Sequence, residues 1–226
     1  NNMDSISIGL PYAQPEPGQE RPDFPTLLHM LADATENAPD RTALICGEES
    51  LTYREYGRCV AGLGKELEAL GARGQRVAVT MTNSNEALVA CYGVLAAGAQ
   101  VSFLNPFYTE RELKPLLRDV DAHVLICHAP YADNVLPVAR DVGNPHILIF
   151  GGNENLNLEQ WRNEESLALT EPFPAPEDLA SLVYTGGTTG APKAVQHTHA
   201  ENIKSAAAIC GAWPTELDKE VWVSAA

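Results

Sequence analysis

Apolar residues recur along the chain at two alternating spacings. Leu27, Leu28 and Leu31 follow the spacing of one helix face, and Pro39 ends that helix. After this point, short β-branched runs predict strands and longer amphipathic stretches predict helices. We expect strands at Thr42–Cys46, Arg76–Met81, Gln100–Leu104, His123–Cys127, His146–Phe150, Ser181–Tyr184 and Val195–Thr198. We expect the intervening helices at Thr52–Leu70, Asn85–Ala97, Thr109–Arg118 and Tyr131–Asp141.

The predicted helices also carry start and stop signals. Gly71 and Gly98 stand where two of them end, since glycine readily adopts the left-handed conformation of a helix C-terminus. Strands and helices alternate at short intervals, which favours a parallel sheet with right-handed crossovers. We therefore predict a doubly wound, mostly parallel α/β sheet with helices on both faces. Capping boxes, in which Thr precedes Glu by three residues, are expected at Thr52/Glu55, Thr109/Glu112 and Thr198/Glu201.

Two stretches fall outside this alternation. Residues 1–23 are rich in proline, glutamine and glutamate, and are predicted to be an irregular lead-in before Phe24. Gly151–Pro176 is more polar and ends in a proline-rich run, so we expect a surface excursion that carries Trp161.

The acidic composition restricts the partners. The chain holds 30 acidic and 15 basic residues, a net charge of −15. Nucleic acid and anionic lipid are therefore not expected partners, because phosphate groups bind to basic surfaces. No transmembrane segment or signal peptide is visible, and we expect a cytoplasmic protein. None of the five cysteines forms a Cys-x-x-Cys pair, so a zinc site has no support, and Cys46, Cys91 and Cys127 are expected to be buried.

The candidate chemistry lies in Thr185–Lys193, which reads TGGTTGAPK. Glycines allow backbone N–H groups to approach an anion closely, threonine hydroxyls add donors, and lysine supplies a positive charge. The segment therefore predicts a polyphosphate-binding loop between two strands. A plain hairpin is the structural alternative. The candidate binding residues are Thr185, Gly186, Gly187, Thr188, Thr189, Gly190 and Lys193.

The loop differs from a Walker A motif, which has lysine directly after its last glycine and opens a helix. Here Ala191 and Pro192 separate Gly190 from Lys193, and a strand is expected next. His197 and His199 follow at a spacing of two. Such a pair on a strand would share one face and could bind a metal ion. No third ligand stands nearby, so we interpret both histidines as structural or close to substrate.

The segment YTGGTTGAPK closely resembles the phosphate-binding signature of the adenylate-forming superfamily. LTYREY at Leu51–Tyr56 and GVLAAGAQVSFLNPFYTEREL at Gly93–Leu113 resemble two further blocks of that family, in the same order. Gly186 is similar to the glycine of many fatty-acyl and aryl-CoA ligases, whereas peptide-synthetase domains usually have serine there. Ala194 departs from a common glycine. The resemblance extends from about Phe24 to the end of the chain.

The resemblance implies an acyl-CoA synthetase that adenylates a carboxylic acid, with a fatty acid expected, and transfers the acyl group to coenzyme A. ATP, Mg²⁺ and coenzyme A are the implied cofactor and co-substrates. The alternatives are an amino-acid-adenylating domain of a peptide synthetase and a non-catalytic nucleotide-binding module. The chain is then an N-terminal part without the C-terminal domain, and no catalytic residue or metal ligand is expected in it.

The resemblance also implies a division of the chain. Residues 24–72 would belong to one N-terminal subdomain, and residues 73–226 would form the doubly wound subdomain that carries the loop. Partner strands of the first segment would then be missing. We accordingly expect exposed apolar surface at Leu44, Ile45 and the Leu63–Leu67 helix, and possible association into a homo-oligomer.

Overall fold

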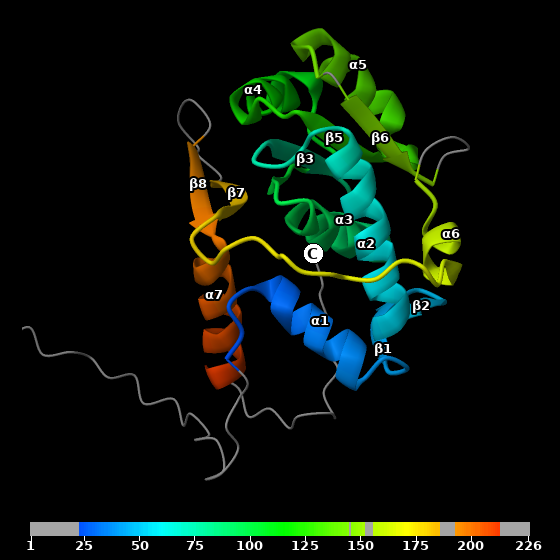
Figure 1. Ribbon diagram of the computed structural model, residues 1–226. Coiled ribbons are helices and arrows are strands. Elements are labelled where there is room, and N and C mark those ends of the chain that lie inside the picture. Colours follow the sequence, from blue (N-terminus) through cyan, green and yellow to red (C-terminus); the bar gives the residue numbers. More distant parts are fainter. Residues whose placement is uncertain (1–22, 145, 152–155, 186–192, 213–226) are drawn as a thin grey trace, which may run out of the picture.

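Figure 1 shows the computed structural model, which describes residues 23–144, 146–151, 156–185 and 193–212. The strands are β1 (Thr42–Cys46), β2 (Glu49–Thr52), β3 (Arg76–Thr80), β4 (Gln100–Phe103), β5 (Val124–His128), β6 (His146–Phe150), β7 (Leu179–Thr185) and β8 (Lys193–Thr198). The helices are α1 (Leu27–Asn37), α2 (Tyr53–Ala69), α3 (Asn85–Ala96), α4 (Glu110–Val120), α5 (Ala132–Val142), α6 (Leu158–Asn163) and α7 (His199–Ala212), with a 3₁₀ turn at Ala129–Tyr131.

A six-stranded sheet with the order β6-β5-β3-β4-β7-β8 organises the chain. The pairs β3–β4, β3–β5, β5–β6 and β4–β7 are parallel, whereas β8 runs antiparallel to β7 at the edge. The prediction of a doubly wound, mostly parallel sheet is confirmed. The strands β1 and β2 form a separate antiparallel pair.

Helices cover both faces of the six-stranded sheet (Figure 1). On one face, Val77 and Val79 of β3 belong to a core cluster that includes side chains of α1, α2, α3 and α6. On the other face, Ala78 belongs to a second cluster with side chains of α4 and α5. Successive residues of a strand point to opposite faces, so the apolar run of β3 serves both cores.

The predicted capping boxes are present. The Thr52 amide donates to Glu55 Oε2 at 2.8 Å, and the Glu55 amide donates to Thr52 Oγ1 at 3.2 Å. Glu112 Oε2 likewise accepts from the Thr109 amide at 2.9 Å. These reciprocal bonds satisfy amide groups that the first turn of a helix leaves without a partner.

The prediction that Gly151–Pro176 is a surface excursion is wrong in its middle. Leu158–Asn163 forms α6, and its Trp161 is 8% exposed in the same core cluster as α2. The Trp161 ring lies against Gly62 of α2, where an added methyl carbon would come within 2.6 Å of the indole. Glycine at position 62 thus leaves the space that the indole fills.

The expected exposure of the first segment is confirmed in part. Ile45 is 68% exposed, but Leu63 and Leu67 are fully buried, so that part of the prediction is wrong. Helix α2 packs closely on α3, because a methyl carbon added at Gly93 would lie 2.6 Å from the Leu63 side chain. The division of the chain at residue 72 stays a prediction. The lead-in up to residue 22 lies outside the described residues.

Among the described residues, no helix is long and apolar enough to cross a membrane.

Candidate functional site

The strands β7 and β8 bring together the two ends of the predicted phosphate-binding loop. Thr185, the last residue of β7, is the register partner of Lys193, the first residue of β8. The predicted site residues between the two strands lie outside the described residues: Gly186, Gly187, Thr188, Thr189 and Gly190.

The two ends of this loop, Thr185 and Lys193, lie at the carboxyl end of β7, which is the side of the sheet where α/β proteins bind ligands. Strand β7 is parallel to β4, with Val101 opposite Ser181, so its carboxyl end lies on the same side as the carboxyl ends of β3, β4, β5 and β6. Ligands of open α/β sheets bind outside these carboxyl ends. Lys193 is exposed at the start of β8, next to the loop.

Side-chain hydrogen bonds fix β7 to its neighbours. Gln100 Nε2, on β4, donates to the Ser181 carbonyl oxygen at 3.1 Å. The Tyr184 hydroxyl donates to Asp119 Oδ2 of α4 at 2.6 Å. Burial and this bond both raise the pKa of Tyr184 well above its ordinary value, so Tyr184 is a neutral donor. The stem of the hairpin is therefore attached to the sheet and to a helix.

The other end of the hairpin is held by the start of α7. The Thr198 amide donates to Glu201 Oε2 at 2.8 Å, and the Glu201 amide donates to Thr198 Oγ1 at 3.2 Å, which confirms the third capping box. The bond from the Thr198 amide, followed by that from its hydroxyl, lowers the pKa of Glu201. The His199 amide donates to the Asp178 carbonyl oxygen at 3.0 Å. Glu201 is thus an ionised cap, and the base of the hairpin is anchored to the preceding loop.

His199 is buried at the start of α7. Its side chain is 1% exposed, and neither ring nitrogen has a hydrogen-bond partner among the described residues. Burial lowers the pKa of His199, although nearby Asp178 opposes this shift, so the imidazole is neutral. The helix begins at His199, which places this residue and His197 in different backbone conformations. In the described part of the chain, no three His, Cys, Asp or Glu side chains are grouped to hold a metal ion.

The four cysteines that the structure describes with their side chains differ in burial. Burial raises the pKa of the Cys59 and Cys91 thiols to about 12, so both are protonated near neutral pH. Cys127 is buried as predicted, whereas Cys91 is half-buried. Cys46 is exposed, and its predicted burial is wrong, because it ends the first strand of the small antiparallel pair.

Comparison with known proteins decides the family. The family described as AMP-binding enzyme matches residues 31–226. The chain belongs to the AMP-binding enzyme family. This membership confirms the resemblance to adenylate-forming enzymes and to their acyl-CoA and aryl-CoA ligases. The phosphate-loop segment Thr185–Lys193 lies inside the matched region.

Several relatives of this chain are named as CoA ligases. It is 32% identical to the long-chain-fatty-acid–CoA ligase of Bacillus subtilis, over 90% of this chain and 40% of that protein. It is 30% identical to the 3-hydroxybenzoate–CoA/4-hydroxybenzoate–CoA ligase of Thauera aromatica, over 71% of this chain and 32% of that protein. The crystal structure of a long-chain-fatty-acid-CoA ligase (FadD1) from Archaeoglobus fulgidus superposes with a TM-score of 0.66. That match has 27% identity and covers 80% of this chain and 39% of the other. The chain thus spans less than half the length of these relatives.

Proposed function

We propose that this chain is part of an ATP-dependent acid–CoA ligase. In the first step, a carboxylate oxygen of the acid attacks the α-phosphorus of ATP, and pyrophosphate leaves as the acyl-AMP bond forms. In the second step, the thiol of coenzyme A attacks the acyl carbon, loses its proton and displaces AMP. Membership of the AMP-binding family, with the glycine-rich segment joining two paired strands, is the observation that carries this proposal.

The loop would hold the β- and γ-phosphates and orient the leaving pyrophosphate. Its donor set fits a polyphosphate, since glycine amides and threonine hydroxyls donate hydrogen bonds and Lys193 brings a positive charge. Catalysis of this kind depends on positioning the phosphates and on neutralising their charge. A Mg²⁺ ion bound with the nucleotide would supply further charge neutralisation at the phosphate oxygens. We assign no described residue as its ligand.

The hairpin would give the loop a fixed base. Tyr184 and Gln100 attach the stem to α4 and β4, while Thr198 and Glu201 fix the far end. A stem held at both ends keeps Thr185 and Lys193 opposite each other.

We propose a fatty acid as the substrate, and an aromatic acid as the second candidate. The Bacillus subtilis relative, which matches 90% of this chain, is named for long-chain fatty acids, whereas the Thauera aromatica relative is named for hydroxybenzoates. Gly186 supports both over an amino-acid-adenylating domain, by its resemblance to CoA ligases. We propose a cytoplasmic location, because ATP and coenzyme A are the proposed co-substrates.

Acid-dependent exchange between pyrophosphate and ATP tests the proposal on the longer protein that contains this chain. The acid panel would hold octanoate, palmitate, 4-hydroxybenzoate and several amino acids. We expect exchange with the fatty acids, and thioester and AMP formation once coenzyme A is added. Exchange with amino acids alone would favour the peptide-synthetase alternative. ATP binding without exchange for any acid would favour a non-catalytic nucleotide-binding module.

A further inference from the structure

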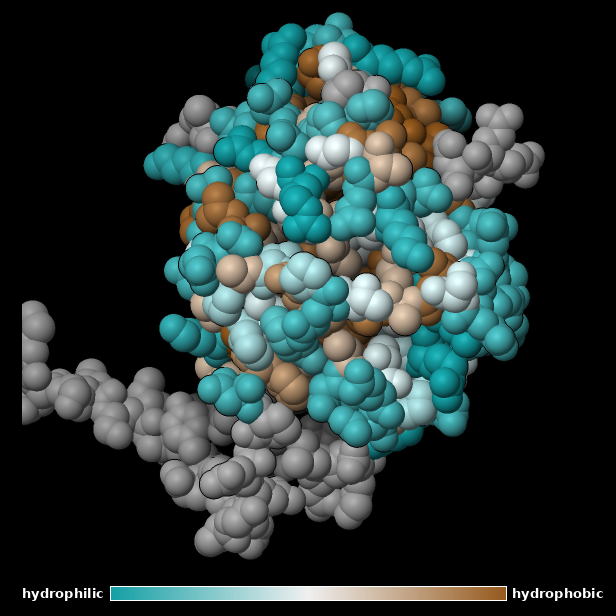
Figure 2. All heavy atoms as spheres, in the orientation of Figure 1, coloured by the Kyte–Doolittle hydropathy of each residue, from teal (hydrophilic) through white to brown (hydrophobic). Residues whose placement is uncertain are grey.

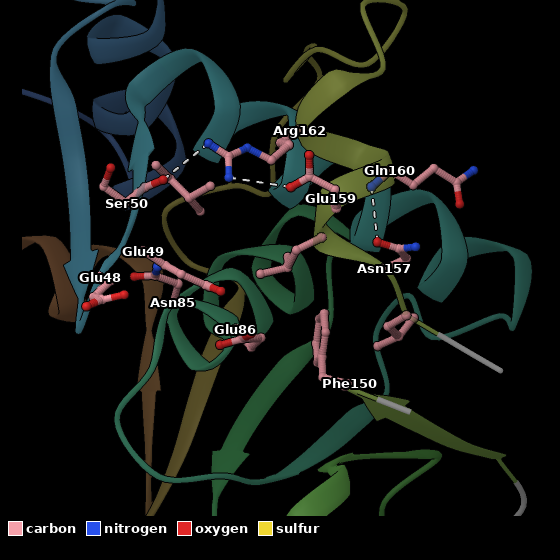
Figure 3. Close-up of a pocket in the computed structure, with 14 residues that line it drawn as sticks. Glu48, Glu49, Ser50, Asn85, Glu86, Phe150, Asn157, Glu159, Gln160 and Arg162 are labelled. Carbon is pink, nitrogen blue, oxygen red and sulfur yellow. Dashed lines mark hydrogen bonds and ion pairs between the residues drawn. The ribbon is translucent and has the colours of Figure 1, made fainter. Parts of the chain in front are cut away.

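A cavity opens between elements other than β7 and β8. Its volume is about 830 Å³, and its lining comes from the β1–β2 hairpin, the start of α3, the end of β6 and α6 with the residues before it. Figure 3 shows side chains from these separate elements around the hollow. Neither β7 nor β8 contributes a residue to the lining. The proposed ligase reaction therefore gives this cavity no role.

The cavity is strongly acidic. Its lining includes four glutamates and one arginine: Glu48, Glu49, Glu86, Glu159 and Arg162. Arg162 is already engaged, because its guanidinium lies 2.7 Å from Glu55 Oε1 and donates to the Ser50 carbonyl oxygen at 3.3 Å. The bond to Glu55 raises the pKa of Arg162 and keeps it charged within this pair. Arg162 also pairs with Glu159, whose Oε2 lies 3.5 Å from its Nη1, so Glu48, Glu49 and Glu86 are the carboxylates that favour a cation in the cavity and oppose ATP or an acid.

A buried amide faces the same cavity. Asn85, the first residue of α3, lines it and is 4% exposed. Within the described parts of the chain, the Asn85 side chain makes no hydrogen bond, whereas the adjacent Ser84 caps the helix by accepting from the Ala87 amide at 3.1 Å. The Asn85 amide is therefore available to a group bound in the cavity. Its carbonyl oxygen can accept a hydrogen bond from an ammonium group.

Apolar side chains complete the lining. Phe150, Leu51 and Leu156 are 1%, 3% and 5% exposed and lie on the cavity wall. A bare metal ion would gain nothing from these side chains, and the described residues hold no cluster of ligands for one. A ligand with separated positive groups on a hydrocarbon chain would use the carboxylates, the amide and the apolar wall together.

We propose that this cavity binds an aliphatic polyamine. Its ammonium groups would pair with the glutamates and donate to the Asn85 carbonyl oxygen, and its methylene chain would lie on Phe150 and Leu156. Glu48 and Glu49 lie on the β1–β2 hairpin and Glu86 on α3, so these three carboxylates approach the cavity from two elements. Separated carboxylates of this kind suit a chain of spaced ammonium groups.

Isothermal titration of the 226-residue chain with spermidine tests the proposal. We expect saturable binding of spermidine that persists when NaCl is added to match the ionic strength of the titrant. The uncharged control, 1,8-octanediol, should not bind. The double variant Glu49→Gln/Glu86→Gln should weaken binding at least tenfold. The matched control is Glu165→Gln, at an exposed glutamate outside the lining, and it should bind like the unchanged chain.

Asn85→Ala separates a binding role from a structural one. We expect it to weaken spermidine binding severalfold and to leave the unfolding of the free chain unchanged, because the amide has no partner to lose. Equal affinity of the unchanged chain, the double variant and Glu165→Gln would overturn the proposal, since binding would then reflect the overall charge. Displacement of spermidine by Mg²⁺ as effective as by a second polyamine, or no binding at all, would also overturn it.

Discussion

Gly62 and Trp161 offer a direct test of how α6 is built into the core. A methyl carbon added at Gly62 would lie 2.6–2.7 Å from Cγ, Cδ1 and Cδ2 of the Trp161 indole. Carbon atoms do not approach so closely, so Gly62→Ala must displace the indole or move the helices apart. Trp161 has little room to shift, because its ring is 8% exposed and packs edge-on against Phe150 at a centroid distance of 6.1 Å.

The expected size follows from two opposing effects. Replacing glycine by alanine inside a helix stabilises the folded chain by roughly 0.5–1 kcal/mol. Overpacking of a buried site costs roughly 1–3 kcal/mol. We therefore expect Gly62→Ala to destabilise the chain by about 1 kcal/mol in the native background. In a Trp161→Ala background the collision is absent, and the same substitution should stabilise the chain by about 0.5–1 kcal/mol.

Urea unfolding followed by far-ultraviolet circular dichroism measures all four variants of this cycle. The dichroism signal is preferred because Trp161→Ala alters the fluorescence. Gly64→Ala is the matched control on the same helix, since its added methyl would lie 3.3 Å from Ala96 Cβ and should cost less. Equal destabilisation by Gly62→Ala with and without the indole would refute the placement of α6 against α2.

Other predictions concern the hairpin and its base. Burial lowers the pKa of His199 below its ordinary value, so as the pH falls the unfolded chain binds a proton before the folded chain does. The neutral, buried His199 therefore contributes fully to stability above about pH 6.5, and this contribution declines at lower pH. The fall in unfolding free energy between pH 7.5 and 5.5 should therefore be smaller for His199→Gln than for the unchanged chain and for the control His197→Gln; equal falls would contradict this. Tyr184→Phe removes the bond to Asp119 and should cost roughly 0.5–1.5 kcal/mol in urea unfolding, with faster amide exchange in β7 and β8. Unchanged stability and exchange would show that this bond does not hold the stem. Self-association stays a prediction, and Ile45→Glu should reduce it in sedimentation velocity experiments, because Ile45 is 68% exposed; an unchanged mass would exclude this surface.

The large apolar elements could be predicted because their patterns are long or strongly periodic. The central strand β3 and helix α2 both lie where the sequence placed them. Strand β2 was missed, since Leu51 is its single apolar residue and a capping box follows directly. Helix α6 was missed because six residues give too short a pattern and prolines dominate the surrounding stretch. Its role depends on Gly62, a contact that local sequence cannot reveal.

The candidate site, like the fold, could be predicted from the sequence only in part. The residue types of the loop were enough to predict phosphate binding from the sequence alone. The pairing of Thr185 with Lys193 depends on the register of two strands, which the motif does not specify. Figure 2 shows a small hydrophobic area where Figure 1 places β7 and β8, and Val183 and Val195 are 48% and 46% exposed there. The spacing of His197 and His199 suggested one face of a strand, but the backbone changes from strand to helix at His199, which ends the alternation of faces.

Single-turnover kinetics of Lys193→Ala in the proposed longer ligase tests the central claim most directly. Acyl-AMP formation from ATP and a fatty acid would be followed separately from thioester formation, which starts from preformed acyl-AMP and coenzyme A. Loss of a charged contact to pyrophosphate costs roughly 1.5–3 kcal/mol, so adenylation should slow by about 10- to 150-fold while thioester formation stays nearly unchanged. Unchanged adenylation, or equal slowing of both steps, would contradict the assignment of Thr185–Lys193 as the phosphate-binding loop.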